Sequence, residues 1–520
     1  MPINKNDSIL IVGAGVFGLS TALELTRRGY TNITVIDRFA PPVPDGSSVD
    51  ISRIIRIDYA DPLYAKMARE AYSGWNAEYK DFFDASGYAI LSEASGHPYI
   101  EKSKQIIYQA GGKVDEFHDI NTLKTIRPAV QANLASAHGY HNPIGGWANA
   151  EGAIQRLATE CSAAGVSFIT GSRGTVQSLR MSGDRVTGVN IVDGSHISAS
   201  HVILSTGAWS TRLLNLAHAA SASGQPVGFI QLTPEEAHTL EKTPVIVNLT
   251  TGVFAFPPTP GSNILKLARH GFGFATAQKS QVTGSTVSGP KPTESNAATG
   301  YLPQDADQGL REGLRQLFPA LGDRPWVYRR MCWYTDTPKG DFIVDWHPQL
   351  KGLFVATGGA GHAFKFLPVL GRYVADCVEE KAEASLREKW RLEKPEGKVT
   401  GEISMAGDGS RGGPPLRKLT VPPNKSPNAT FTPTSLLNQA FKSTVTNEST
   451  PYEANVRVGS ISLAEIAITR ASFITIAFVT TSTAARMERA DLSAWVTGTS
   501  ASSFSAPEEL AIARSGEKRG

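Results

Sequence analysis

The first side chains in this sequence that could do chemistry are its solitary cysteines. Cys161, Cys332 and Cys377 are the only cysteines, and they lie far apart along the chain. They form neither a metal-binding spacing nor a disulfide framework, so no metal site is predicted and a reducing compartment suits the chain. Each cysteine is therefore available for chemistry of its own.

Two pairs of polar residues could bind or activate a ligand. Arg53 and Arg56 are three residues apart and would share one face of a helical turn, where two guanidinium groups could hold a carboxylate or a phosphate. A solvated basic face is the alternative, and the local sequence alone favours it. Lys266 and His270 would lie on one face of a strand at 264–270. The two side chains then belong either to a binding or catalytic site or to the solvent-exposed edge of a sheet.

The segment from residue 9 to residue 37 is the element that must position a cofactor. It contains an apolar strand at 9–12, a helix at 19–28, a second strand ending at Asp37, and between the first two a loop that reads Gly13-Ala14-Gly15-Val16-Phe17-Gly18. The first glycine permits a tight turn, the second lets a pyrophosphate approach the backbone, and the third lets helix and strand pack closely. The N-terminus of the helix then faces the phosphates, and Asp37 has the spacing of a ribose ligand.

The alternative for this segment is an ordinary βαβ unit whose glycines only shape a turn. If the segment does bind a dinucleotide, the motif alone does not distinguish NAD from FAD. The acid at Asp37 disfavours the 2′-phosphate of NADP.

Length and composition restrict the class of protein. With 520 residues and a net charge of +3, the chain should hold two or three domains and a large core. The charge is spread without a basic block, so no nucleic-acid partner is predicted. No stretch is long and apolar enough to cross a bilayer, and the polar first eight residues predict no signal peptide.

Later segments predict elements that return to the cofactor. A helix is expected at 62–79 and a strand at 82–91. A buried strand at 201–204 runs into small residues that can close on the cofactor, and a sheet-rich region follows at 248–336. At 353–366 an apolar strand leads into a second glycine loop, which would let backbone approach a planar cofactor.

The last hundred residues have a different composition. From residue 420 onward Ser, Thr, Pro and Asn dominate. This composition predicts a disordered tail that carries no chemistry. Its short apolar run, Ile474–Val479, is expected to lack the strand partners that a core would need.

Taken together, these motifs resemble those of the FAD-dependent amine oxidases that include monomeric sarcosine oxidase, pipecolate oxidase, saccharopine oxidase and fructosyl amino acid oxidase. The resemblance covers roughly residues 8–419. It is carried by motifs in a shared order: the first glycine loop, Ser47-Ser48 with Arg53-Ile54-Ile55-Arg56, Lys266 with His270, Cys332-Trp333-Tyr334-Thr335-Asp336-Thr337-Pro338, and Gly361-His362-Ala363-Phe364-Lys365-Phe366.

The resemblance implies a role for each matching side chain. Cys332 matches a cysteine that attaches covalently to the flavin ring, and Lys266 matches a lysine that promotes the reaction with oxygen. Arg56 and Lys365 match groups that clamp the substrate carboxylate. Arg53 and His270 match groups that line the flavin or active-site cavity, which gives Lys266, His270 and Arg53 as the implied catalytic set. The residues implied to hold FAD are Gly13, Ala14, Gly15, Val16, Phe17, Gly18, Asp37, Arg38, Ser47, Ser48, Cys332, Gly361, His362, Phe364 and Lys365.

An α/β (α+β) fold follows from the same resemblance. A Rossmann-type FAD-binding domain would comprise residues 1–60, 150–215 and 340–392, a mixed-sheet substrate domain residues 61–149 and 216–339, and a C-terminal strap residues 393–419, before the disordered tail at 420–520. The implied reaction oxidises a secondary amino acid of the saccharopine, pipecolate or N-alkyl type to an imine and reduces oxygen to hydrogen peroxide. A monomer in the cytoplasm or peroxisome is expected, and the chain ends Lys518-Arg519-Gly520, without a recognisable peroxisomal signal.

Departures from the family pattern bear on the substrate. Sarcosine oxidases carry a histidine where this chain has Val49, and fructosyl amino acid oxidases tend to carry an acid where it has His270. The segment 50–59 looks most like the saccharopine and pipecolate oxidase branch. A fructosyl amino acid oxidase and a tailoring oxidase of an N-methylated metabolite are the nearer alternatives. An NAD-dependent dehydrogenase, a flavin dehydrogenase with another electron acceptor, and a binding protein that keeps only the fold are the more distant ones.

Overall fold

Two units make up the chain, residues 1–443 and residues 444–520, and each is described by itself. The computed structural model describes residues 3–280, 282, 284–290, 302–394 and 407–419, together with the backbone of the strands at 466–468 and 474–476. Within these residues no helix is long and apolar enough to cross a membrane.

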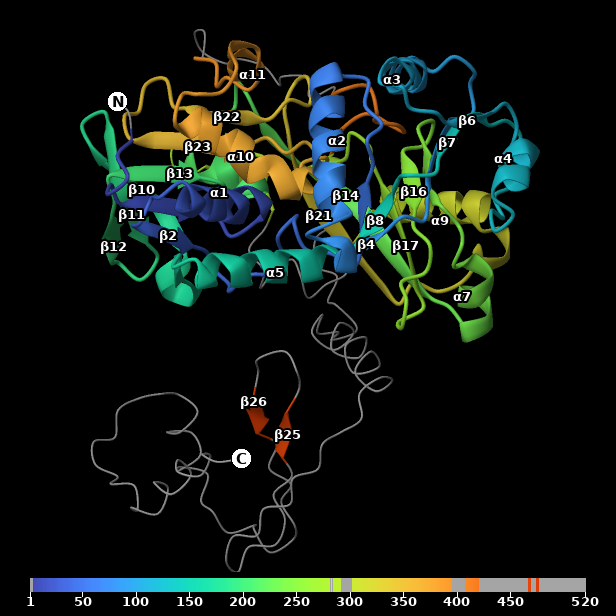
Figure 1. Ribbon diagram of the computed structural model, residues 1–520, viewed down its shortest axis with the longest axis horizontal. Helices are drawn as coiled ribbons and strands as arrows, with labels where there is room; N and C mark the ends of the chain where they lie inside the picture. Colours follow the sequence, from blue (N-terminus) through green and yellow to red (C-terminus); the bar gives the residue numbers. More distant parts are fainter. Residues whose placement is uncertain are drawn as a thin grey trace, which may run out of the picture. The chain divides into compact units, whose positions relative to one another are not determined.

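A six-stranded sheet is built around the N-terminal strand (Figure 1). Across the sheet, its strands are β22 (Ile343–Trp346), β23 (Leu353–Thr357), β13 (His201–Leu204), β1 (Ile9–Val12), β2 (Ile33–Ile36) and β9 (Ser167–Ile169). All neighbours are parallel except β22 and β23. β1 has β2 on one side and β13 on the other, so the strand at 201–204 returns to the first βαβ unit, as predicted.

Both faces of this sheet are covered, which is why its strands are apolar throughout. Ile9 and Ile11 pack in one core with the helices on one face, which are α1 (Val16–Arg27), α5 (Ala150–Ala163) and α10 (Leu367–Val378). Leu10 and Val12 point the opposite way and pack in a second core. That core includes a three-stranded antiparallel sheet made of β10 (Val176–Ser182), β11 (Arg185–Ile191) and β12 (His196–Ser198).

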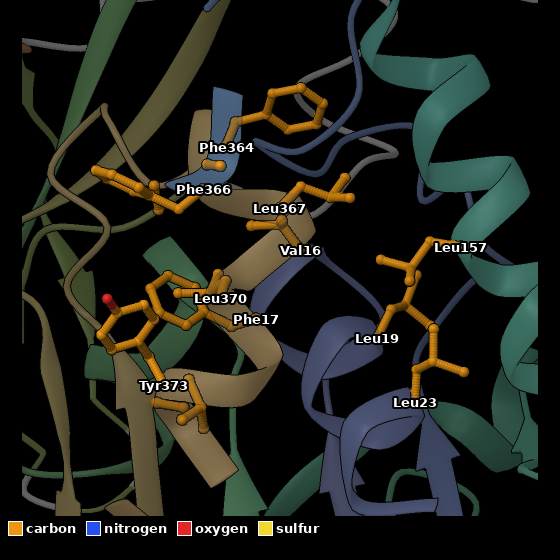
Figure 2. Packing of buried hydrophobic residues seen from close by; sticks show 14 of the residues in the cluster. Val16, Phe17, Leu19, Leu23, Leu157, Phe364, Phe366, Leu367, Leu370 and Tyr373 are labelled. Atoms are coloured by element: carbon orange, nitrogen blue, oxygen red, sulfur yellow. The ribbon is translucent and has the colours of Figure 1, made fainter. Parts of the chain in front are cut away.

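Helix α1 lies between α10 and α5, and this packing fixes the first glycine loop (Figure 2). Leu19 and Leu23 point toward Leu157 of α5, while Phe17 lies beside α10. A Cβ atom at Gly371 of α10 would lie 2.1 Å from the backbone oxygen of Ser20. The absence of a side chain at this position therefore lets the two helices touch.

A ten-stranded sheet forms the other half of the described unit. Its path runs through β24 (Arg417–Lys418), β18 (Phe274–Ala275), β14 (Ser221–Gln231), β17 (Ile264–Arg269), β16 (Val253–Ala255), β15 (Val245–Asn248), β5 (Tyr88–Ser92), β7 (His138–Asn142) and β6 (Asp115–Phe117), and β21 (Tyr328–Asp336) pairs with β14. Helix α9 (Gln304–Leu317) lies on β14, β16 and β17 (Figure 1). The leucines of this helix are buried.

Shorter elements complete the described unit. The remaining helices are α2 (Pro62–Trp75), α3 (Pro98–Gln109), α4 (Ile120–Ile126), α6 (Ser210–Leu213), α7 (Pro234–Leu240) and α11 (Ala384–Lys389). One small sheet joins β3 (Arg53–Ile55), β8 (Gly146–Ala148) and β4 (Phe83–Asp84), and another joins β19 (Gln278–Lys279) and β20 (Thr286–Val287). The mixed α/β fold is the predicted one, while the division into FAD-binding and substrate domains stays a prediction.

Three local predictions differ from the structure. Arg53 lies on β3, where Ile54 and Ile55 favour a strand, so Arg53 and Arg56 do not share the face of a helical turn. The strand expected at 82–91 is broken into β4 and β5, because Gly87 adopts a φ of +94° between them. The helix expected at 62–79 ends at Trp75.

The tail prediction lies mostly outside the described residues. Within residues 420–520 only β25 (Ile466–Ile468) and β26 (Ile474–Ile476) are described, and they pair antiparallel. The pairing gives the apolar run at 474 a strand partner, which the sequence did not predict.

Candidate functional site

A cavity of about 410 Å³ opens at the carboxyl ends of β1, β2 and β13. After β1 the chain passes to β2 on one side, and β13 pairs on the other side, so the cavity lies where the strand order reverses. Open α/β sheets bind their ligands at such a point. The lining comes from residues 12–17, 36–38, 46–49, 53, 205–209, 332–335, 359 and 361–364, with further contributions from 43, 174–176, 192 and 212–213.

The first glycine loop has the geometry of a phosphate cradle. Gly13 adopts a φ of +112°, and a Cβ atom there would lie 2.4 Å from the backbone oxygen of Ser205. A Cβ atom at Gly18 would overlap the backbone oxygen of Gly13, whereas one at Gly15 would meet only the side chain of Ser48. Two of the glycines are therefore required by packing, and Gly15 leaves the backbone open toward the cavity. A dinucleotide fits this arrangement.

The predicted ribose ligand lies at the end of β2. Asp37 lines the cavity, and its two carboxylate oxygens accept the backbone N–H groups of Ala14 (2.8 Å) and Arg38 (2.7 Å). Burial raises the pKa of Asp37. Arg38 forms a fork with Asp45 and stacks 4.2 Å from the centre of the Trp209 ring. Arg38 is thus held at the cavity by protein contacts.

The double serine joins the glycine loop to β21. Ser48 accepts a hydrogen bond from the backbone N–H of Val16 (2.9 Å), and Ser47 donates to the backbone oxygen of Trp333 (2.5 Å). Cys332, one residue earlier on β21, lines the cavity, and its sulfur lies 3.5 Å from Nη2 of Arg53. All three cysteines are described, and only Cys332 lines this cavity.

Lys266 belongs to a buried cluster of charges, which excludes a solvated edge. Its Nζ atom lies 2.9 Å from Oδ2 of Asp50, and Lys266 and Asp50 both have side chains only 1% exposed. The same oxygen is 2.5 Å from Nη1 of Arg53 and 2.9 Å from Nη2 of Arg330. We call these four residues the Asp50 cluster. Arg53 lines the cavity, and Lys266 is not among its lining residues.

Within the Asp50 cluster, burial and ion pairing shift the pKa values in opposite directions. Burial lowers the pKa of Lys266 to about 7, against an upward contribution from Asp50. Burial alone would raise the pKa of Asp50, but Lys266, Arg53 and Arg330 outweigh it and hold the pKa well below the usual range. The carboxylate therefore stays ionised. The sequence analysis missed the roles of Asp50 and Arg330; the only local signal was the three-residue spacing of Asp50 and Arg53.

Arg56 and Lys365 form a second buried group of cations, around Tyr59. The Arg56 guanidinium lies 4.5 Å from the centre of the Tyr59 ring, and the Lys365 ammonium lies 5.5 Å from it. Nη1 of Arg56 is buried without a hydrogen-bond partner, and Lys365 donates to the backbone oxygen of His362 (3.0 Å). Burial, with Arg56 adding to it, lowers the pKa of Lys365 well below its usual value. We call these two residues the Arg56 pair.

The second glycine loop brings three of the predicted residues, Gly361, His362 and Phe364, to the cavity. Contacts within the protein explain why the first two are a glycine and a histidine. A Cβ atom at Gly361, which has a φ of +78°, would lie 2.5 Å from the Tyr334 ring. His362 bridges the hydroxyl of Tyr59 (3.0 Å) and the backbone oxygen of Gly340 (2.8 Å) and stacks on Phe342. Gly361, His362 and Phe364 line the cavity, whereas Gly18, Arg56, Lys266, His270 and Lys365 are not among its lining residues.

His270 lies one residue beyond the end of β17 and contacts two distant segments. Its Nδ1 atom is 3.2 Å from the hydroxyl of Tyr334, and its Nε2 atom is 2.9 Å from the hydroxyl of Ser410. Sequence reasoning assigned no role to Tyr334, Ser410 or the neighbouring Asp408. Ser410 follows His270 by 140 residues, and no local pattern connects them.

Comparisons with known proteins identify the family of the chain. Residues 8–377 match the model of the family described as FAD dependent oxidoreductase. The chain is 32% identical to the L-saccharopine oxidase of Schizosaccharomyces pombe over 412 residues, covering 74% of this chain and 92% of that protein. It is 32% identical to an amino acid oxidase of Aspergillus flavus over 451 residues, covering 73% and 93%.

Solved structures give the same result. A fructosyl peptide oxidase from Aspergillus nidulans matches with a TM-score of 0.71 and 28% identity, covering 80% of this chain and 98% of that one. A fructosamine oxidase from Aspergillus fumigatus matches with a TM-score of 0.68 and 28% identity, covering 75% and 90%. The glycine loop, the acid at the end of β2 and these similarities together show that the chain belongs to the FAD dependent oxidoreductase family.

Proposed function

We propose that this chain is an FAD-dependent oxidase that converts the C–N bond of a secondary amino acid of the saccharopine, pipecolate or N-alkyl type to an imine, with oxygen reduced to hydrogen peroxide. The observation that carries the proposal is the Arg56 pair, in which Nη1 of Arg56 is buried without a partner. Nearly all buried polar groups in proteins are hydrogen-bonded, so an unpaired guanidinium nitrogen needs an acceptor from elsewhere. The carboxylate of an amino acid supplies that acceptor.

A carboxylate fits the Arg56 pair on electrostatic grounds as well. Burying two cations close together is unfavourable, and Arg56 already lowers the pKa of Lys365. An anion between them would relieve this repulsion and satisfy the guanidinium fork. The names of two relatives support the same class of substrate, since one is a saccharopine oxidase and another an amino acid oxidase.

Bound FAD supplies the redox chemistry, by accepting a hydride from the carbon next to nitrogen and passing the electrons to oxygen. The residues that would hold it are the first glycine loop, Asp37, the double serine and the second glycine loop. Cys332 would attach covalently to the ring, because it is the cysteine that lines the cavity. Lys266 would supply a positive charge held by Asp50 where negative charge develops on oxygen, and Arg53, which unlike Lys266 lines the cavity, would add to it.

A peroxide-release screen tests the proposed function. The purified chain is offered saccharopine, pipecolate, sarcosine and fructosyl amino acids, and hydrogen peroxide is measured. Saccharopine or pipecolate should give the largest response. Release of peroxide only with fructosyl amino acids would establish the alternative, which the fructosyl peptide oxidase structures favour. Release with none of the four would contradict the proposal.

Acid precipitation tests the covalent attachment. The yellow colour should remain with the precipitated wild-type protein and appear in the supernatant of the Cys332→Ala variant. The Cys161→Ala variant is the matched control, because Cys161 is buried against the backbone of Leu19 and is not part of the cavity lining. Colour that stays wholly in the wild-type supernatant would remove Cys332 from this role.

Assembly and compartment are also proposals. A monomer is supported by the 27% identity over 390 residues to a monomeric sarcosine oxidase of Arthrobacter. The cytoplasm or the peroxisome is the proposed compartment, and a peroxisomal sarcosine oxidase of Mus musculus, 25% identical over 372 residues, supports the second.

A further inference from the structure

The described part of the C-terminal strap, residues 407–419, is anchored beside His270. β24 of the strap pairs with β18, and the backbone N–H of Gly412 donates to the backbone oxygen of His270 (3.1 Å). Arg411 forms a buried fork with Asp336 at 2.9 and 2.5 Å. The strap therefore keeps a fixed position on the ten-stranded sheet, and its polar side chains are placed as precisely as those of the sheet.

A chain of hydrogen bonds runs from this strap to the cavity. The hydroxyl of Ser410 donates to Oδ1 of Asp408 (2.5 Å) and lies 2.9 Å from Nε2 of His270. Nδ1 of His270 lies 3.2 Å from the hydroxyl of Tyr334. Tyr334 is partly exposed and lines the cavity, so this series of hydrogen bonds ends at a residue of the cavity wall.

The donor and the acceptor of every hydrogen bond in this series follow from the charge states of Asp408 and His270. Burial alone would raise the pKa of Asp408, but His362 and the hydrogen bonds from Ser410 outweigh it and lower the pKa, so Asp408 stays a carboxylate and only accepts. Ser410 must then donate to Asp408 and accept the N–H of His270 at Nε2. The Nδ1 atom of a neutral His270 has a lone pair left and accepts the O–H of Tyr334.

The surroundings of His270 keep it neutral. Burial lowers the pKa of His270, the cations Arg411 and Arg56 and the nearby His362 lower it further, and the carboxylate of Asp408 opposes them without outweighing them. Burial also keeps the pKa of Tyr334 above its usual value, so the phenol stays protonated. Asp408, His270 and Tyr334 are the three titratable groups in this series of hydrogen bonds, and none of them changes charge near neutral pH. The donor and the acceptor of each hydrogen bond are therefore fixed at that pH.

We propose that the strap, through Ser410 and His270, turns the Tyr334 hydroxyl so that its oxygen offers only lone pairs to the cavity, and that the site thereby selects ligands that present an amine N–H. Tyr334 would touch the substrate, while Asp408, Ser410 and His270 are positioning residues. The inference rests on the proposed function and deepens it, because it names the group that would recognise the substrate nitrogen.

The experiment compares two ligands that differ at one atom. L-Pipecolate has a ring N–H where L-tetrahydropyran-2-carboxylate has a ring oxygen, and both keep the carboxylate. Dissociation constants are measured on the FAD-loaded full chain, from flavin absorbance for the ether and from the concentration dependence of anaerobic flavin reduction for the amine. The wild-type chain should prefer pipecolate.

Removing the hydroxyl of Ser410 should reverse the direction of the hydrogen bond between His270 and Tyr334. In Ser410→Ala the Nε2 atom of His270 loses its acceptor, so His270 can protonate Nδ1 instead and donate to Tyr334, whose O–H then turns to the cavity. The preference for pipecolate over the ether should fall by about tenfold to a hundredfold, the size of a lost hydrogen bond to a charged ligand. Ser223→Ala is the matched control, because Ser223 is a buried serine that donates to a different aspartate, Asp336.

Two outcomes would overturn the inference. One is a Ser410→Ala variant that weakens both ligands equally, and the other is a preference that does not change. Nitrogen-15 NMR of histidine-labelled protein gives a measurement that needs no substrate: the proton of His270 should be on Nε2 in the wild type and on Nδ1 in Ser410→Ala. Peroxide release with none of the tested amines would contradict the proposed function, whereas the His270 proton position and the ether affinity would still decide the inference.

Discussion

The molecule buries two groups of cations near its cavity, and they are satisfied in different ways. In the Asp50 cluster, Lys266, Arg53 and Arg330 all contact one carboxylate oxygen supplied by the chain. In the Arg56 pair, one guanidinium nitrogen has no partner and the ammonium contacts a backbone oxygen. The first group is complete in the free protein, and in the second we expect a bound anion to supply the missing acceptor.

We infer from this difference that the first group holds its charges in place and that the second binds a ligand. A cation that is already held by a buried carboxylate keeps its position throughout a reaction and needs no reorganisation when negative charge develops nearby. A cation without such a partner gains most when a ligand supplies one. Mutations in the two groups should therefore change different measurements.

Loss of the central carboxylate should have the largest effect. Asp50→Asn leaves the buried Lys266 and the partly buried Arg53 and Arg330 without their anion, and removing one partner of a buried ion pair typically costs about 3–5 kcal/mol. The free energy of unfolding of the FAD-loaded protein, measured with denaturant, should fall by that amount. Arg56→Met is the comparison variant and should cost much less, because it removes a cation with an unpaired nitrogen. Equal losses would show that the two groups do not differ.

Lys266→Met should slow the oxygen step and leave the amine step nearly unchanged. The substitution keeps the volume and removes the charge, and one preorganised group of this kind is worth about 2.7–4 kcal/mol, or about a hundredfold to a thousandfold in rate. Stopped-flow reoxidation of reduced flavin measures the first step, and anaerobic reduction measures the second. Lys351→Met, at an exposed lysine paired with Asp184, is the control. If reduction slows as much as reoxidation, Lys266 acts on the substrate.

Substitutions in the Arg56 pair should weaken binding of the carboxylate. A bond to a charged group contributes about 1.5–3 kcal/mol, so Arg56→Met and Lys365→Met should each lose about tenfold to a hundredfold in affinity for an amino acid substrate. The amide of the same amino acid, which has no negative charge, supplies the control ligand. The loss should be much smaller with the amide. Unchanged carboxylate affinity in both variants would remove the pair from the site.

The oxygen step should also depend on pH through the Asp50 cluster. Because burial lowers the pKa of Lys266 to about 7, its charge is lost as the pH rises through that value, and the reoxidation rate should fall by up to tenfold per pH unit above it. The sign for stability is opposite: between about pH 7 and the ordinary value of 10.5, the unfolded chain binds more protons at this lysine, so its contribution to stability rises with pH. Lys266→Met should abolish both dependences.

Removal of the tail should have the smallest effect. The Asp50 cluster, the Arg56 pair and β24 all lie before residue 420. A chain that ends at Leu419 should therefore keep its FAD, its thermal midpoint and its peroxide release. Loss of folding on this truncation would show that residues after 419 contribute to the core, contrary to the prediction from their composition.

What the sequence predicted correctly is mostly local. Gly13, Gly18 and Asp37 lie within one βαβ unit, and their spacing is set by a turn and a helix that any chain must build in the same way. The roles of Cys332 and Lys266 came from the resemblance and stay predictions. The periodicity argument for Arg53 and Arg56 was wrong because the β-branched residues between them form a strand instead of a helical turn.

What the sequence did not predict depends on contacts between distant segments. Arg330 reaches Asp50 across 280 residues, and Ser410 reaches His270 across 140. Neither pair produces a periodic pattern in the sequence, because each residue fits the strand or loop in which it lies without regard to its distant partner. Only the pairing of β21 with β14, and of the strap with β18, brings these side chains together.

The pairing of β21 with β14 has a consequence for how this site can change in evolution. Arg330, Cys332, Tyr334 and Asp336 alternate along one strand, so they share a face at intervals of about 6.8 Å. They contact Asp50, Arg53, His270 and Arg411 in that order. A single inserted or deleted residue in β21 would turn part of this series to the opposite face at once. Point substitutions can vary each contact separately, but a change in the length of this strand would alter at once the Asp50 cluster, the proposed cofactor attachment and the proposed substrate recognition, so its length should be the least variable feature of the site.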